Sequence, residues 1–124
     1  MVADQTNQSA AAAASDDAFF GRMNDPSGAA SVRGLCGDEM EFYLTIRDDR
    51  VEQVRYYTVG CGNTRSSARA VARRAQGRTI TEALSISAGE IILSGECEPE
   101  EGRHCAILAV TTFYRAVADY LLAP

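Results

Sequence analysis

The feature that most constrains the fold is a strict alternation of apolar and polar side chains over residues 39–47. The apolar members occupy every second position: Met40, Phe42, Leu44 and Ile46. This period of two predicts a strand with one buried face. Asp48-Asp49 supplies a turn, and residues 51–59 are rich in the β-branched and aromatic side chains of a returning strand. We therefore predict an antiparallel hairpin, with residues 29–34 as a third strand at its edge.

The hydrophobic period changes to that of a helix after Gly60-Cys61-Gly62. One helical stripe is formed by Ala68, Val71, Ala72 and Ala75. Gly77 is expected to end this helix. Two short helices are predicted from Thr79 through about Ile86 and near residues 88–93, and a last amphipathic helix from His104 onward. Strands followed by helices predict an α+β fold, a small and about three-stranded antiparallel sheet with helices packed on one face.

The first residues are polar and alanine-rich, so we expect residues 1–17 to be a disordered tail and residues 18–124 to form a single domain. Phe19 and Phe20 indicate a short anchoring helix, followed by an irregular or extended segment. The chain does not begin like a signal peptide, and no uninterrupted apolar run approaches the roughly 18 residues that cross a bilayer. We expect a cytoplasmic protein without a membrane segment.

The composition excludes several kinds of chemistry. All 12 basic residues are arginine, so a phosphate-binding loop with its lysine and a Schiff-base lysine are impossible. The chain has one histidine and lacks the G-x-S-x-G pattern of a nucleophile elbow. Its net charge of −5 argues against nucleic-acid binding. We expect neither an enzyme nor catalytic residues.

The four cysteines, at positions 36, 61, 97 and 105, indicate metal or sulfur chemistry in a reducing compartment. Cys36 precedes the first hairpin strand in a Cys-Gly-Asp loop, and Cys61 follows the second strand. Antiparallel pairing brings these two ends together. Cys105 follows His104 at the start of the last helix, whose dipole favours a thiolate there. With Asp38 and His104, these thiols form a donor set that suits iron or zinc.

These stretches resemble the iron–sulfur cluster assembly scaffolds of the IscU/NifU N-terminal type, over roughly residues 19–122. The matching segments are Cys36-Gly37-Asp38, Gly60-Cys61-Gly62, Gly77-Arg78-Thr79, Glu82-Ala83-Leu84 and residues 104–109. The resemblance implies that the metal is bound by Cys36, Asp38, Cys61 and Cys105. It also implies that His104 is an additional ligand candidate or a proton donor.

The resemblance further implies a scaffold that binds iron and sulfide or persulfide and transfers the cluster to apoproteins. The cluster is expected to be transient and of the [2Fe–2S] type, and Zn²⁺ can occupy the same site. The implied partners are a cysteine desulfurase as sulfur donor and apo iron–sulfur acceptor proteins, with neither nucleic acid nor membrane. Two alternatives stay open: a zinc-dependent sulfur acceptor or sulfurtransferase that builds no cluster, and a structural zinc protein.

Two features depart from the family pattern. The Leu-Pro-Pro-x-Lys segment that binds an Hsp70-type chaperone in relatives is replaced by residues 98–103, so docking of such a chaperone is not expected. Cys97 has no counterpart among the three family cysteines. Glu96 and Glu98 flank it and would suppress its thiolate form, so we expect a loop cysteine rather than a ligand.

Plainer interpretations remain for the individual residues. Cys36 and Cys61 could be buried structural thiols, Asp38 a turn residue and His104 a residue that starts a helix. Arg65, Arg69 and Arg73 follow one another at a spacing of four. They form either a solvated face or a docking surface for an acidic partner such as the desulfurase. The acidic residues 96–101 are expected only to be solvated.

Overall fold

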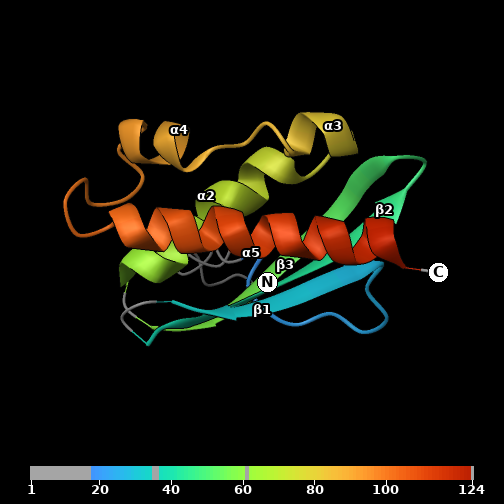
Figure 1. Ribbon diagram of the computed structural model, residues 1–124, viewed down its shortest axis with the longest axis horizontal. Helices are drawn as coiled ribbons and strands as arrows, with labels where there is room; N and C mark the ends of the chain where they lie inside the picture. Colours follow the sequence, from blue (N-terminus) through green and yellow to red (C-terminus); the bar gives the residue numbers. More distant parts are fainter. Residues whose placement is uncertain (1–17, 35–36, 61, 124) are drawn as a thin grey trace, which may run out of the picture.

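The hairpin follows the alternation in the sequence (Figure 1). The computed structural model describes residues 18–34, 37–60 and 62–123. Strand β2 (Glu39–Arg47) pairs antiparallel with β3 (Arg50–Val59), and β1 (Gly28–Arg33) pairs with the other edge of β2. The third strand is thus confirmed. Asp48 and Asp49 connect β2 to β3 with φ values of 54° and 63°, the left-handed backbone of a two-residue type I′ turn.

The helices predicted after the hairpin are present, and their ends follow local sequence signals. Helix α2 (Gly62–Ala75) stops just before Gly77, which has a φ of +89°. Helices α3 (Ile80–Ala83) and α4 (Ala88–Leu93) each begin with a capping box, formed by Thr79 with Glu82 and by Ser87 with Glu90. Helix α3 is shorter than predicted, and α5 (Arg103–Leu122) completes the fold.

Helices α2 and α5 pack on the sheet, with α5 running across it and α4 packing against α5 (Figure 1). The buried face of the sheet meets α5 through the rings of Phe42 and Phe113, whose centroids are 5.8 Å apart in an edge-to-face arrangement. The ring centroid of Tyr56 in β3 lies 6.4 Å from that of Phe42, and both side chains are fully buried. The α+β architecture predicted from the sequence is confirmed.

The segment before β1 differs from its prediction, because none of the described residues 18–34 is helical. Phe20 forms a parallel bridge with Tyr56 instead. The amide of Tyr56 donates to the Phe19 carbonyl at 2.8 Å, and the amide of Gly21 donates to the Tyr56 carbonyl at 2.7 Å. Without this segment, these backbone groups at the outer edge of β3 would lack partners in the sheet. Hydrogen bonding to them is therefore favoured over the formation of a local helix. The proposed tail, residues 1–17, lies outside the described residues.

Helix α5 is, by length and composition alone, apolar enough to cross a membrane. The sequence has no uninterrupted apolar run of this length here, because polar residues such as Thr111, Thr112 and Arg115 interrupt the helix. Half of the apolar window is buried inside the protein, where it covers the sheet. These properties are also those of a core helix, so α5 is weak evidence for a membrane segment.

Two glycine substitutions test the packing of α5 on β1. A Cβ at Gly28 would lie 2.4 Å from the backbone oxygen of Ala116, whereas a Cβ at Gly89 in α4 would meet only Ser87 Oγ, at 3.9 Å. We expect Gly28→Ala to lower the free energy of unfolding by about 1–3 kcal/mol through overpacking. The control Gly89→Ala should raise it by about 0.5–1 kcal/mol, because alanine favours a helix. Urea unfolding measures both, and equal stability of the two variants would contradict this packing.

Candidate functional site

The register of the hairpin brings two loops together at one end of the sheet. Glu39 pairs with Val59, so the chain segments that contain Asp38 and Gly60 lie side by side. A Cβ at Gly60 would lie 2.7 Å from both Cγ and Oδ2 of Asp38. The missing side chain of Gly60 makes room for the Asp38 carboxylate. The backbone oxygen of Asp38 also accepts a 2.7 Å hydrogen bond from the amide of Gly34.

The two helices that pack on the sheet contribute the next two groups. Thr64 lies in the first turn of α2, and Cys105 is the third residue of α5. The Thr64 hydroxyl donates to Asp38 Oδ2. The hydroxyl oxygen of Thr64 also lies 3.5 Å from Cys105 Sγ. Thr64 and Cys105 are both fully buried, and Asp38 is half-buried. One hydroxyl therefore joins a carboxylate and a thiol that are distant in the sequence.

The direction of these hydrogen bonds follows from the chemistry of the groups. An ionised carboxylate can only accept, so the single proton of Thr64 points to Asp38. In the contact between Thr64 and Cys105 either atom can be the donor; with the Thr64 proton directed to Asp38, a protonated Cys105 thiol would donate to the hydroxyl oxygen. The arrangement places one hard oxygen donor and one soft sulfur donor next to each other, a combination that suits iron or zinc.

Of the four predicted ligands, the described residues include Asp38 and Cys105, and the structure brings these two together through Thr64. Cys36 and Cys61 lie outside the described residues. Within the described part of the chain, no group of three His, Cys, Asp or Glu side chains is arranged to hold a metal ion. The four-residue ligand set stays a prediction.

His104 lies on the exposed side of α5. It lines a shallow groove of about 200 Å³ with Arg33 and Gly34 of the β1 end and with Ile107, Leu108 and Thr111 of α5. Neither Asp38 nor Cys105 lines this groove. The role of His104 as an additional ligand stays a prediction.

Cys97 is buried, with 5% of its surface exposed, and belongs to the hydrophobic core. Its Cβ would lie 3.0 Å from a Cβ at Gly102, the residue that precedes α5. The residue therefore packs beneath the start of α5. Cys97 thus lies in the loop between α4 and α5, as expected, with its side chain buried there. That it is not a ligand stays a prediction.

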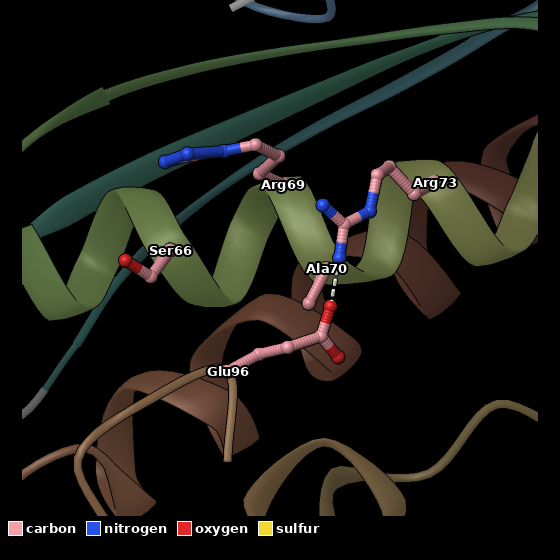
Figure 2. Close-up of a pocket in the computed structure, with 5 residues that line it drawn as sticks. All are labelled: Ser66, Arg69, Ala70, Arg73 and Glu96. Carbon is pink, nitrogen blue, oxygen red and sulfur yellow. Dashed lines mark hydrogen bonds and ion pairs between the residues drawn. The ribbon is translucent and has the colours of Figure 1, made fainter. Parts of the chain in front are cut away.

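The predicted basic stripe on α2 is partly occupied by contacts within the chain. The Arg65 guanidinium lies 4.2 Å from the centroid of the Phe20 ring, and Arg73 forms an ion pair with Glu96. Figure 2 shows Arg69 extending to the side of the helix away from Glu96. Arg69 and Arg73, with Ser66, Ala70 and Glu96, line a small pocket along α2. Docking of an acidic partner on this face stays a prediction.

Glu96 was expected to be solvated, but it is half-buried and paired with two arginines. Arg74 Nη2 lies 2.6 Å from Glu96 Oε1, and Ser94 Oγ donates to the same oxygen at 2.8 Å. Burial alone would raise the pKa of Glu96. The hydrogen bonds from Arg74 and Ser94 and the charges of both arginines outweigh burial and lower the pKa below its ordinary value of 4.5. The loop that leads to Cys97 is thus fixed to α2.

Sequence reasoning missed Thr64. A signal was present, because Thr64 lies four residues before Ala68 and extends the apolar stripe of α2 by one turn toward Cys61. A polar residue at a core position must find a hydrogen-bond partner inside the protein. The sequence pattern could not show which residues these partners are, since Asp38 and Cys105 both come from distant segments.

The lowered pKa of Glu96 predicts a loss of stability in acid. The carboxylate stabilises the folded protein at pH values above 4.5, and this contribution disappears as the pH falls through the lower pKa of the folded state. We expect Glu96→Gln to reduce the free energy of unfolding at pH 7 and to flatten its dependence on pH below 4.5. Urea unfolding at several pH values measures this. Glu100→Gln is the control, because that side chain is 82% exposed. Identical pH profiles for Glu96→Gln and the unmodified protein would contradict the prediction.

This chain is similar to known proteins in both sequence and fold. The iron–sulfur cluster assembly scaffold proteins IscU 1 and IscU 2 of Archaeoglobus fulgidus are each 32% identical over 101 residues, covering 81% of this chain and 66% of theirs. The chain thus spans about two thirds of the length of these two relatives. The iron–sulfur cluster assembly scaffold protein IscU of Escherichia coli is 34% identical over 100 residues, covering 78% of this chain and 77% of its own.

Among solved structures, a protein from Fervidobacterium islandicum AW-1, described as a candidate iron–sulfur cluster assembly scaffold for the SUF system, has a TM-score of 0.65. The match covers 80% of this chain and 86% of that chain at 20% identity, so it supports the fold alone. Residues 10–123 match the NifU-like N terminal domain. The chain therefore belongs to the NifU-like N-terminal domain family.

Proposed function

We propose that this protein is a scaffold on which an iron–sulfur cluster is assembled and from which the cluster passes to acceptor apoproteins. The observation that carries the proposal is the contact of Asp38 and Cys105 through Thr64, across separations of 26 and 41 residues. Relatives that carry the name of iron–sulfur cluster assembly scaffold support the same conclusion.

The proposed ligands are Cys36, Asp38, Cys61 and Cys105. Cys36 is two residues from Asp38, and Cys61 follows Gly60, which lies against the Asp38 carboxylate. In a set of three thiolates and one carboxylate, the bond from the carboxylate oxygen to iron is the weakest, because oxygen is a harder and weaker ligand for cluster iron than a thiolate. A cluster held in this way can be released, which a scaffold requires. His104 is the proposed additional ligand.

Sulfur delivery needs a donor that carries sulfane sulfur, for which a cysteine desulfurase with a persulfide is the proposed partner. A scaffold thiolate, at Cys105 or Cys61, attacks the terminal sulfur of the donor persulfide. The S–S bond of the donor breaks, the donor leaves as a thiolate, and the scaffold holds the new persulfide. Conversion of this sulfur to bridging sulfide takes two electrons, which an external reductant supplies.

Anaerobic reconstitution with Fe²⁺, a cysteine desulfurase, cysteine and a reductant tests the function. We expect about one sulfide per iron and a visible charge-transfer spectrum, both lost in Cys36→Ala, Cys61→Ala and Cys105→Ala because each removes a thiolate ligand. Cys97→Ala is the matched control and should assemble a cluster, since Cys97 belongs to the core. Retained zinc without sulfide or chromophore would contradict the scaffold and favour the zinc-dependent sulfur acceptor.

Removal of the oxygen ligand should make a bound cluster more persistent. We expect the cluster on Asp38→Ala to live several-fold longer and to transfer several-fold more slowly to an apo-ferredoxin, because the labile oxygen ligand is absent. Transfer is followed by the change in the visible circular dichroism spectrum after separation of the two proteins. An unchanged transfer rate would contradict the role of Asp38 in release.

A further inference from the structure

We propose that Thr64 is a positioning residue of this site, whose hydroxyl holds the Asp38 carboxylate and the Cys105 sulfur in place before metal arrives. The proposal rests on the proposed function for what the site binds, and on the described contacts for how the site is arranged. It assigns a role to a residue that is neither a cysteine nor a ligand.

The burial of Thr64 shows that its hydroxyl has a structural task. The residue is fully buried in the first turn of α2, on the stripe that faces the core. A buried hydroxyl without a partner is costly, so its position is fixed by the groups that bond to it. Those groups include a carboxylate oxygen of Asp38, in the loop before β2, and the sulfur of Cys105 in α5.

Comparison with a second buried threonine shows what is unusual about Thr64. Thr112 of α5 is also fully buried, and its hydroxyl donates to the Leu108 carbonyl of the same helix at 2.7 Å. This bond within the helix is the usual way to satisfy a buried threonine. Thr64 bonds instead to residues 26 and 41 positions away. Through these two described contacts its hydroxyl connects α2 to the loop before β2 and to α5.

Loss of the hydroxyl would affect both proposed ligands together. Asp38 Oδ2 accepts from Thr64 and also lies 2.7 Å from the place that a Cβ at Gly60 would take. With a methyl group in place of the hydroxyl, the carboxylate would lose this hydrogen bond and be held less firmly beside α2. Cys105 would lose its contact with the Thr64 hydroxyl. Groups that orient metal ligands typically change metal affinity by about 10- to 100-fold.

The test measures Zn²⁺ affinity of the metal-free protein by competition with a chromophoric chelator. We expect Thr64→Val and Thr64→Ala to raise the dissociation constant by about 10- to 100-fold. Thr64→Ser keeps the hydroxyl and should restore affinity to near that of the unmodified protein. Thr112→Val removes a buried hydroxyl far from the site and is the matched control. Circular dichroism of each variant confirms that it is folded, and two variants without the hydroxyl guard against one failing to fold.

A second measurement does not depend on metal. Iodoacetamide labelling of the metal-free protein, followed by trypsin, reports on Cys105 alone, because cleavage after Arg103 and Arg115 yields residues 104–115 with one cysteine. We expect Cys105 to be labelled at least several-fold faster in Thr64→Val than in the unmodified protein, with Thr64→Ser and Thr112→Val unchanged.

The outcomes separate this proposal from the proposed function. Unchanged Zn²⁺ affinity and unchanged labelling in Thr64→Val would overturn the positioning role and leave the scaffold intact. Failure of the unmodified protein to assemble a cluster would overturn the proposed function. In that case, faster labelling in Thr64→Val would still support the positioning role, and unchanged labelling would overturn it.

Discussion

The register of the β2–β3 hairpin is the constraint on which the rest of the structure depends. A slip of one residue would turn every side chain of a strand to the opposite face. It would also separate Asp38 from Gly60, whose missing side chain makes room for the carboxylate. The two-residue turn at Asp48 and Asp49, both in the left-handed region, fixes this register from the far end of the hairpin. Fold and site are thus determined by the same pairing.

Helices α2 and α5 likewise serve both fold and site, because Thr64 and Cys105 lie on the same helix faces as the core residues. Cys105, Ala109 and Phe113 follow one another at a spacing of four along α5, and all three are fully buried. Phe113 packs on Phe42 of the sheet, so the contact that docks α5 also sets the position of Cys105. Thr64 bears the same relation to Ala68 in α2. In α2 and in α5, the row of core residues thus begins with a group of the site: the Thr64 hydroxyl in α2 and the Cys105 thiol in α5.

Sequence periodicity predicted what depends on local pattern, and it failed where long-range contacts decide. The strands of the hairpin, the two short helices after Thr79 and the helix that starts near His104 are local features, and all are present. Phe19 and Phe20 do not form a helix, because the edge of β3 offers backbone partners that no local pattern shows. Glu96 pairs with Arg73 and Arg74 across 23 and 22 positions of sequence, which charge patterning within the loop could not reveal. Thr64 was missed for the same reason, since its partners lie on other segments.

The arrangement of the site also bears on the alternative that this protein is a structural zinc protein. In a structural zinc site the metal supplies folding energy, and the chain unfolds without it. Here the rings of Phe42, Tyr56 and Phe113 form a core beneath the helices, and this core involves no metal donor. Asp38 and Cys105 are held by Thr64, a group of the protein itself. A scaffold has to be empty between one cluster and the next, and it must keep its ligands arranged while it is empty. A hydrogen bond from the protein can do this without competing for the metal, because it can be exchanged for a metal bond when the metal binds.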